Sequence, residues 1–306
     1  MPQTFKRRII VGFGHHAETN KWLKQMKRAD TVLLEAPPEP YLEKVLSKKI
    51  SMKNYFTALR FGADLSPVFP EHTARLIRGL RASHAKGKKI LQSEPERKGF
   101  LKMLSDELPS AQQKARAAWP FGGFDEGIKA VTEKAKLNAE INNMREKERV
   151  NWILQNVNTF GKRVFIETGQ NHTKVYHELK RKLEGTHNNV TQIQLNKREA
   201  QRYGRGVGFI YPPENQLERL FIFSKNPDHS KIKLLAARAL ISDWLNLQHY
   251  RKRKLESRSV KTVFKIARFT NKLSLEQCEK AFNLIREDRT GKLVFSLEKL
   301  KKLIQT

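Results

Sequence analysis

The stretch RRIIVGFGHHAETNKWLKQMKRADTVLLEA, residues 7–36, carries the pattern that decides the fold. It begins with a continuous apolar run over residues 7–13 and ends with a second over residues 31–36. Between the two runs, Trp22 and Met26 recur at the spacing of one helix face. A strand, a helix and a strand so close together predict a βαβ unit, in which the strands lie parallel with a right-handed crossover.

Three further runs extend this sheet. KKILQSE (88–94) and KRVFIET (162–168) each contain a short apolar run that does not alternate with polar residues, as is typical of parallel strands that are covered on both faces. NNVTQIQLN (188–196) alternates apolar with polar residues, which predicts an edge strand. The intervening segments 37–87 and 123–157 have helical patterns. We therefore expect an α/β fold with a mostly parallel central sheet flanked by helices.

The charge is strongly basic and unevenly distributed. The 306 residues include 60 Lys and Arg against 31 Asp and Glu, a net charge of +29. Residues 225–306 hold 20 of these basic and 8 of these acidic residues, so this segment is about twice as basic per residue as residues 1–224. We expect an α/β domain over 1–224 and a basic all-helical extension over 225–306. Such a charge favours polyanions, either nucleic acid or an anionic surface, as partners of the C-terminal region.

Several classes of protein are excluded by composition. Cys278 is the only cysteine, so the chain can form neither an intramolecular disulfide nor a cysteine-based zinc site. No apolar run approaches the roughly 18 residues that a transmembrane helix needs, and the N-terminal apolar run is too short for a secretory signal. We expect a cytoplasmic protein, and these patterns do not encode its oligomeric state.

Polar side chains follow each of the four apolar runs. His15 and His16 come after the first, Glu35 stands near the end of the second, Glu94 closes the third and His172 follows the fourth. The carboxyl ends of parallel strands meet at one edge of a sheet, and ligands bind in the crevice there. Imidazole and carboxylate groups at this edge can serve a divalent ion or one activated water.

The order of these motifs resembles the TraB/Tiki/erythromycin-esterase-like superfamily, which includes the ChaN-like haem-binding proteins. Its members share a G-x-x-H after strand one, a glutamate after strand two, a helix with an arginine–acid pair, and a second G-x-x-H after a later strand. The chain offers, in that order, GFGH (12–15), VLLEAP (32–37), MREKERVNWI (144–153) and VFIETGQNHTKVYHEL (164–179). The resemblance covers roughly residues 7 to 185.

The resemblance implies a catalytic centre and a metal. His15, Glu35 and His172 would bind a divalent ion such as Mn, Co, Zn or Mg, or position a water. Arg145 would stabilise an oxyanion or phosphate with its planar fork. Arg149 is the alternative to Arg145. From charge patterning alone, Arg145 can also be interpreted as a solvated charge on the helix surface. We assign His15, Glu35, Arg145 and His172 to catalysis.

Substrate contacts are expected from four more residues, namely Glu94, His16, Glu18 and Arg149. Some esterase-like members have a glutamate shortly before the first histidine, whereas this chain has Gly12 and Phe13 there and Glu18 after it. We expect a hydrolase of ester or peptide bonds. The alternative is a regulatory protein that binds nucleic acid or another polyanion. In that case, the polar residues at the strand ends have a structural and not a catalytic role. Binding of haem or anionic lipid is a third interpretation.

Overall fold

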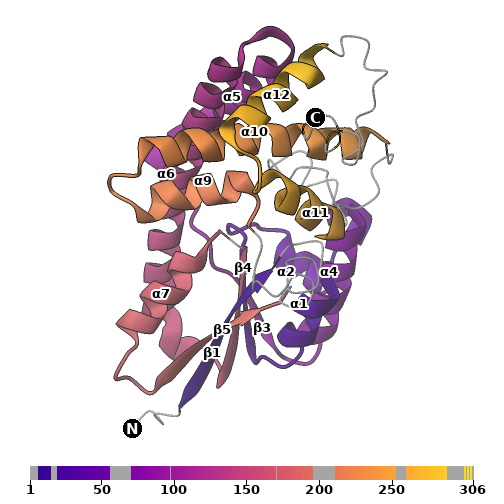
Figure 1. Cartoon of the computed structure of the whole chain (residues 1–306). Coiled ribbons are helices and arrows are strands. Elements are labelled where there is room, and N and C mark those ends of the chain that lie inside the picture. The colour runs from indigo at the N-terminus through magenta and orange to yellow at the C-terminus, as the bar shows by residue number, and fades with distance from the viewer. Residues whose placement is uncertain are drawn as a thin grey trace. The chain divides into compact units, whose positions relative to one another are not determined.

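A computed structural model describes most of the chain (Figure 1). The described residues are 6–14, 19–55, 70–96, 98–169, 171–195, 211–252, 260–287, 300, 302 and 304. The chain divides into two compact units. The sheet unit comprises Met1–Arg97 and Met144–Lys197, and the helical unit comprises Lys98–Asn143 and Arg198–Thr306. The expected boundary after residue 224 lies inside the helical unit, which also takes in a long segment from the middle of the chain.

The sheet unit contains five parallel strands in the order β3-β2-β4-β1-β5. Their bounds are β1 (Arg7–Gly14), β2 (Thr31–Leu34), β3 (Lys89–Gln92), β4 (Arg163–Gly169) and β5 (Asn188–Gln194). The expected α/β fold is confirmed, and the alternating run forms the edge strand β5. β1 and β2 are consecutive in the βαβ unit, but β4 lies between them and pairs with both.

Helices cover both faces of this sheet (Figure 1). Their bounds are α1 (Thr19–Met26), α2 (Leu42–Leu46), α4 (Pro70–His84), α6 (Phe124–Asn156), which continues into the 3-10 turn η1 (Val157–Thr159), and α7 (Thr173–Lys182). Successive side chains of a strand point to opposite faces. Accordingly, Val164 and Ile166 pack in the core formed with α6 and α7, whereas Phe165 packs in the core formed with α1, α2 and α4. Burial on both faces is the reason that the central strands β2 and β4 lack the alternation of polar residues seen in β5. The expected cover on both faces is not found for β3, because it lies at the edge of the sheet and is only partly buried.

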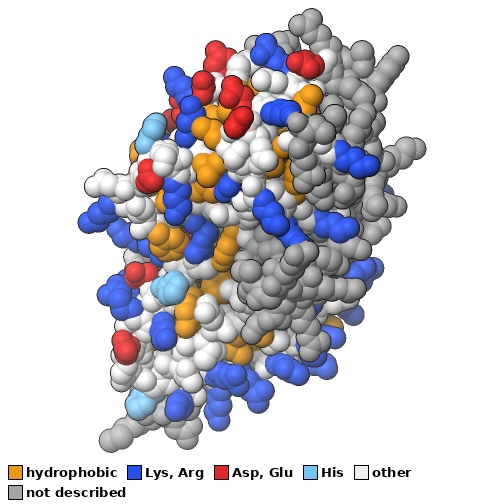
Figure 2. Space-filling model, viewed as in Figure 1, with side chains coloured by type: hydrophobic (Ala, Val, Ile, Leu, Met, Phe, Trp, Pro, Cys, Tyr) orange, Lys and Arg blue, Asp and Glu red, His pale blue; other side chains and the backbone are white. Residues whose placement is uncertain are grey.

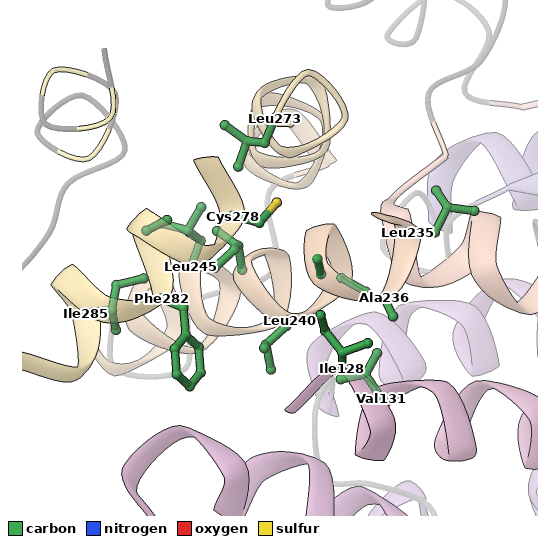
Figure 3. Packing of buried hydrophobic residues seen from close by; sticks show 14 of the residues in the cluster. Ile128, Val131, Leu235, Ala236, Leu240, Leu245, Leu273, Cys278, Phe282 and Ile285 are labelled. Atoms are coloured by element: carbon green, nitrogen blue, oxygen red, sulfur yellow. The ribbon is translucent and has the colours of Figure 1, made fainter. Parts of the chain in front are cut away.

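The helical unit contains α5 (Gly99–Phe121), the first part of α6, α9 (Pro213–Phe223), α10 (His229–Lys252), α11 (Val260–Thr270) and α12 (Leu275–Glu287). Its core is built around Leu240 and Phe282, with Ile128 of α6 packed against them (Figure 3). Cys278 is fully buried in the same core, and this burial raises the pKa of its thiol to about 12. None of the helices in the described part of the chain is long and apolar enough to cross a membrane.

Candidate functional site at the carboxyl edge of the sheet

The carboxyl ends of β2, β3 and β4 bring together four residues that the sequence predicts for the site. Glu35 follows β2, Glu94 follows β3, His172 follows β4, and Arg145 reaches them from α6. All four belong to the sheet unit. Three other predicted site residues lie outside the described residues: His15, His16 and Glu18.

The imidazole of His172 lies between two carboxylates. Its Nε2 is 3.0 Å from Oε1 of Glu35, and its Nδ1 is 3.0 Å from Oε1 of Glu146. The three side chains are 13%, 7% and 3% exposed, so solvent screens these contacts only weakly. His172 is positioned by the tight turn that joins β4 to α7, in which its backbone N–H donates to the carbonyl of Gly169 at 3.2 Å.

This environment keeps the imidazole charged. Burial alone would lower the pKa of His172, because a low-dielectric surrounding disfavours the charged form. The negative charge of Glu35 and the hydrogen bonds to Glu146 and Glu35 outweigh burial and raise the pKa to about 10. At neutral pH, His172 is therefore an imidazolium that donates from both ring nitrogens.

Glu35 is held by hydrogen bonds to both its side chain and its backbone. Its Oε2 accepts a hydrogen bond from the N–H of Gly169, and its own N–H donates to Oε2 of Glu167 at 3.3 Å. A Cβ at position 169 would lie 3.1 Å from Cδ2 of His172 and 3.3 Å from Oε2 of Glu35. The glycine of the second G-x-x-H motif therefore permits the close approach of the carboxylate to the strand end.

Glu146 is the site residue that the sequence reasoning missed. Its second oxygen, Oε2, accepts the N–H of Val175 in the first turn of α7 at 3.2 Å, where the helix dipole also favours a negative charge. A signal for it was present in the helical spacing. Val150, Ile153 and Val157 follow it at intervals of three or four and are buried, so Glu146 is an acid on the buried face of α6.

Arg145 is the most exposed charged group of this cluster. It pairs with the buried carboxylate of Glu94 while its own side chain remains 21% exposed. Burial opposes its charge, but Glu94 and then Glu35 raise the pKa of the guanidinium. Arg145 is therefore not a solvated charge on the helix surface, which was the alternative interpretation of the sequence, because it pairs with a buried acid.

Arg149, the alternative to Arg145, is almost completely buried, at 2% exposure. Its Nε donates to Oγ of Ser93 at 2.9 Å, and its Nη2 donates to the carbonyl of Glu167 at 2.6 Å. These bonds fasten α6 to the ends of β3 and β4. The position of Arg149 therefore suits the support of the site, whereas Arg145 lies where a bound anion can reach it.

The donors of this site fit part of a metal centre. Two ligands of one ion, each about 2.1 Å from it, lie about 3.0 Å apart in an octahedral site and about 3.4 Å apart in a tetrahedral one. Nε2 of His172 and Oε1 of Glu35 are 3.0 Å apart, which fits neighbouring ligands of an octahedral ion. A histidine ligand normally donates its other ring N–H to a carboxylate, and Glu146 accepts from Nδ1 in that way. Within the residues that the structure describes, no group of three or more His, Cys, Asp and Glu side chains is arranged around a common ion. The third ligand expected from the sequence is His15.

Comparison with known proteins adds one relative of this chain. This chain is similar to an uncharacterized protein of Archaeoglobus fulgidus. The two are 26% identical over an alignment of 297 residues, which covers 89% of this chain and 97% of that protein. No protein-family model matches the chain, and no solved structure matches it.

Proposed function

We propose that the protein is a cytoplasmic hydrolase of ester or peptide bonds, whose centre lies at the carboxyl edge of β2 and β4. The observation that carries the proposal is the clamping of His172 between Glu35 and Glu146, with Arg145 beside them. A buried imidazole with two carboxylates, at the edge where α/β proteins bind ligands, is suited to chemistry that needs a held proton or a held cation.

Glu35 and His172 would hold a divalent ion such as Mn, Co, Zn or Mg, with His15 as the third ligand. Such an ion, when bound, supplies a Lewis acid for the carbonyl group and lowers the pKa of an attached water. Nε2 of His172 can bind the ion only after it has lost its proton. Because the pKa of His172 is about 10, the Nε2 proton must be displaced, and metal affinity is expected to rise with pH.

Glu146 and Gly169 act by positioning the other residues. Glu146 accepts from Nδ1, which directs Nε2 toward Glu35 and fixes the ring. The N–H of Gly169 holds Oε2 of Glu35, which leaves Oε1 directed toward the imidazole. The buried acid and the strand-end amide thus fix the two groups on which the reaction depends.

Arg145 would bind the charge that develops on the substrate. Its guanidinium is oriented by Glu94, and part of it remains accessible to solvent. The planar fork of an arginine matches the two oxygens of a carboxylate or phosphate and stabilises an oxyanion in a partly dry site. Glu94 is expected to affect substrate binding through this orientation of Arg145.

The test measures metal content and hydrolysis in the same preparations. Wild type, Glu35→Gln and His172→Ala are incubated with Mn²⁺, desalted and assayed by elemental analysis, then tested with chromogenic esters and fluorogenic peptides. His177→Ala is the matched control, because His177 lies on the same helix and is exposed. We expect wild type and the control to retain metal and activity, and the two site variants to lose both. Unchanged activity in both site variants would contradict the proposal.

A polyanion partner for the basic C-terminal region is a separate proposal that the sequence alone supports. Six basic residues occur between positions 251 and 261, and residues 253–259 lie outside the described part of the chain. Neutralising these six residues in the full chain should reduce binding of a labelled polyanion and its salt dependence. Unchanged binding would contradict this assignment.

A further inference from the structure

A basic surface lies at the amino edge of the sheet, the edge remote from Glu35 and His172. Two exposed basic side chains stand at the beginning of each of four adjacent strands. These eight residues, which we call the amino-edge surface, are Lys6 and Arg8 at β1, Lys27 and Arg28 at β2, Lys86 and Lys89 at β3, and Lys162 and Arg163 at β4. Figure 2 shows Lys and Arg side chains gathered along the lower margin of the molecule, where the strands of Figure 1 begin.

Two arginines of this surface are direct neighbours across strands. Arg8 of β1 is in register with Arg163 of β4, and both side chains are exposed. Residues in register on adjacent strands point to the same face and lie about 5 Å apart, so like charges at such a pair destabilise the sheet. An arginine pair at this position is favourable when an anion lies over it.

Other basic groups at this edge are held in place by uncharged partners. Nζ of Lys88 donates to the carbonyls of Lys27 and Ala29, each at 2.6 Å, and Nζ of Lys89 donates to the carbonyl of Thr159 at 2.9 Å. A carbonyl orients an ammonium group but does not neutralise it. These lysines therefore add positive charge in fixed positions, which reduces the entropy lost when an anion binds.

The acids at this edge are few. Asp30 is exposed at the start of β2, where its Oδ2 accepts the backbone N–H of Arg163 at 2.9 Å. Glu184 is exposed in the turn before β5. Two carboxylates against eight exposed cations leave a strongly positive field over the amino ends of β1 to β4.

The absence of exposed apolar groups indicates the class of partner. In the described part of the chain, the large hydrophobic side chains that are exposed are Tyr41, Phe100, Met103, Phe223 and Leu247. None of them belongs to the segments that form the amino-edge surface. Binding of single strands relies on aromatic side chains that stack on bases, and lipid surfaces are bound more firmly when apolar groups insert. A surface whose described residues present mainly cations, and no large exposed apolar side chain, is suited to a phosphate backbone whose bases are paired.

We propose that the amino-edge surface binds the phosphate backbone of double-stranded nucleic acid without reading its sequence. From Lys89 on β3 to Arg8 on β1 there are three strand spacings, about 14 Å, over which a B-form duplex carries about eight phosphates. The proposal does not depend on the hydrolase. The seven residues of β4 separate the two edges of the sheet by roughly 20 Å, so both sites can be occupied together.

The test compares two triple variants that carry the same change in net charge. Arg28→Gln/Lys86→Gln/Arg163→Gln removes three exposed cations of the amino-edge surface, one each from the turn before β2, the turn before β3 and the first residue of β4. Lys102→Gln/Lys114→Gln/Arg116→Gln removes three exposed cations from α5 in the helical unit. Binding of a short labelled DNA duplex of mixed sequence is measured by fluorescence anisotropy over a series of salt concentrations. Circular dichroism checks the fold of each variant, and Arg28→Lys/Arg163→Lys preserves the charge at two of the positions.

The slope of log affinity against log salt is the deciding quantity. Loss of three phosphate contacts should reduce its magnitude by about 2.7 in the amino-edge variant, whereas the α5 variant and the lysine variant should keep the wild-type slope. Equal losses in the two glutamine variants would overturn the proposal, because binding would then follow net charge alone. Tighter binding of a single strand, or binding of anionic vesicles without binding of the duplex, would also overturn it.

Discussion

Glu146 and His172 are 26 residues apart in the chain, yet Oε1 of Glu146 lies 3.0 Å from Nδ1 of His172 in the interior of the sheet unit. The contact joins α6 to the turn between β4 and α7. Since Glu35 contacts the other ring nitrogen, one imidazolium balances two buried carboxylates. Because Glu35 and Glu146 meet His172 only in the folded protein, the pKa of His172 is raised by folding.

The charge of Glu146 should control the pKa of His172. In Glu146→Gln, one of the two groups that stabilise the imidazolium is neutral, so the pKa of His172 is expected to fall below its wild-type value of about 10. An NMR titration of the histidine ring resonances measures this change. Glu178→Gln on α7, the helix that follows His172, is the control and should leave the pKa of His172 unchanged. An unaltered pKa in Glu146→Gln would show that Glu35 alone holds the proton.

Stability should decline as the pH rises above neutrality. The folded-state pKa of His172 is raised from 6.5 to about 10, so its contribution to the free energy of unfolding is complete below pH 6.5 and is lost between pH 6.5 and 10. Denaturant unfolding of wild type and His172→Gln across this range isolates the effect as a difference. The wild-type advantage should shrink steadily with pH. A difference that stays constant would contradict the assignment of this titration to His172.

A methyl group at position 169 should disturb the site more than the fold. Gly169→Ala would place Cβ 3.1 Å from His172 and 3.3 Å from Glu35, so one of these side chains must move by a few tenths of an ångström. We expect loss of metal binding and hydrolysis with a smaller fall in Tm. Gly123→Ala is the control, since no heavy atom lies within 4 Å of the added Cβ. Full activity in Gly169→Ala would show that this close approach is dispensable.

The two neighbouring arginines should respond differently to replacement by lysine. Arg149→Lys loses the fork that reaches both Ser93 and the carbonyl of Glu167 in a buried position, and we expect a loss of unfolding free energy on the order of 3 kcal/mol. Arg145→Lys keeps a cation beside Glu94 at a partly exposed position and should lower hydrolysis more than stability. Urea unfolding and steady-state kinetics on both variants test this division. The reverse result would exchange the two roles.

Much of the sheet unit could be predicted because its signals are local. The apolar runs before Glu35 and His172 form strands that are buried on both faces, whereas the run before Glu94 forms the edge strand β3, which is only partly buried. The alternating run after Gly185 forms the opposite edge strand. Parallel pairing then required that the residues after these strands meet at one edge. Glu35 and His172 are in contact for this reason.

The order of strands and the partners of buried charges were decided by tertiary structure. β4 lies between β1 and β2 because pairing across the sheet depends on long-range packing, which a run of apolar residues does not encode. The division of the chain into two units also depends on long-range packing, since α5 and the first part of α6 belong to the same unit as the C-terminal helices.

For this protein, the amino-acid sequence by itself determined the α/β class, the strand positions and the residues that end the strands, because hydrophobic periodicity acts over a few residues. Tertiary structure alone decided that Glu146 binds His172 and that Arg145, not Arg149, remains partly exposed. It also set Arg8 beside Arg163 at the opposite edge. Packing between segments far apart in the chain determines which face of α6 is buried and how β1 aligns with β4. The charged side chains on these elements come into contact only after that packing is complete.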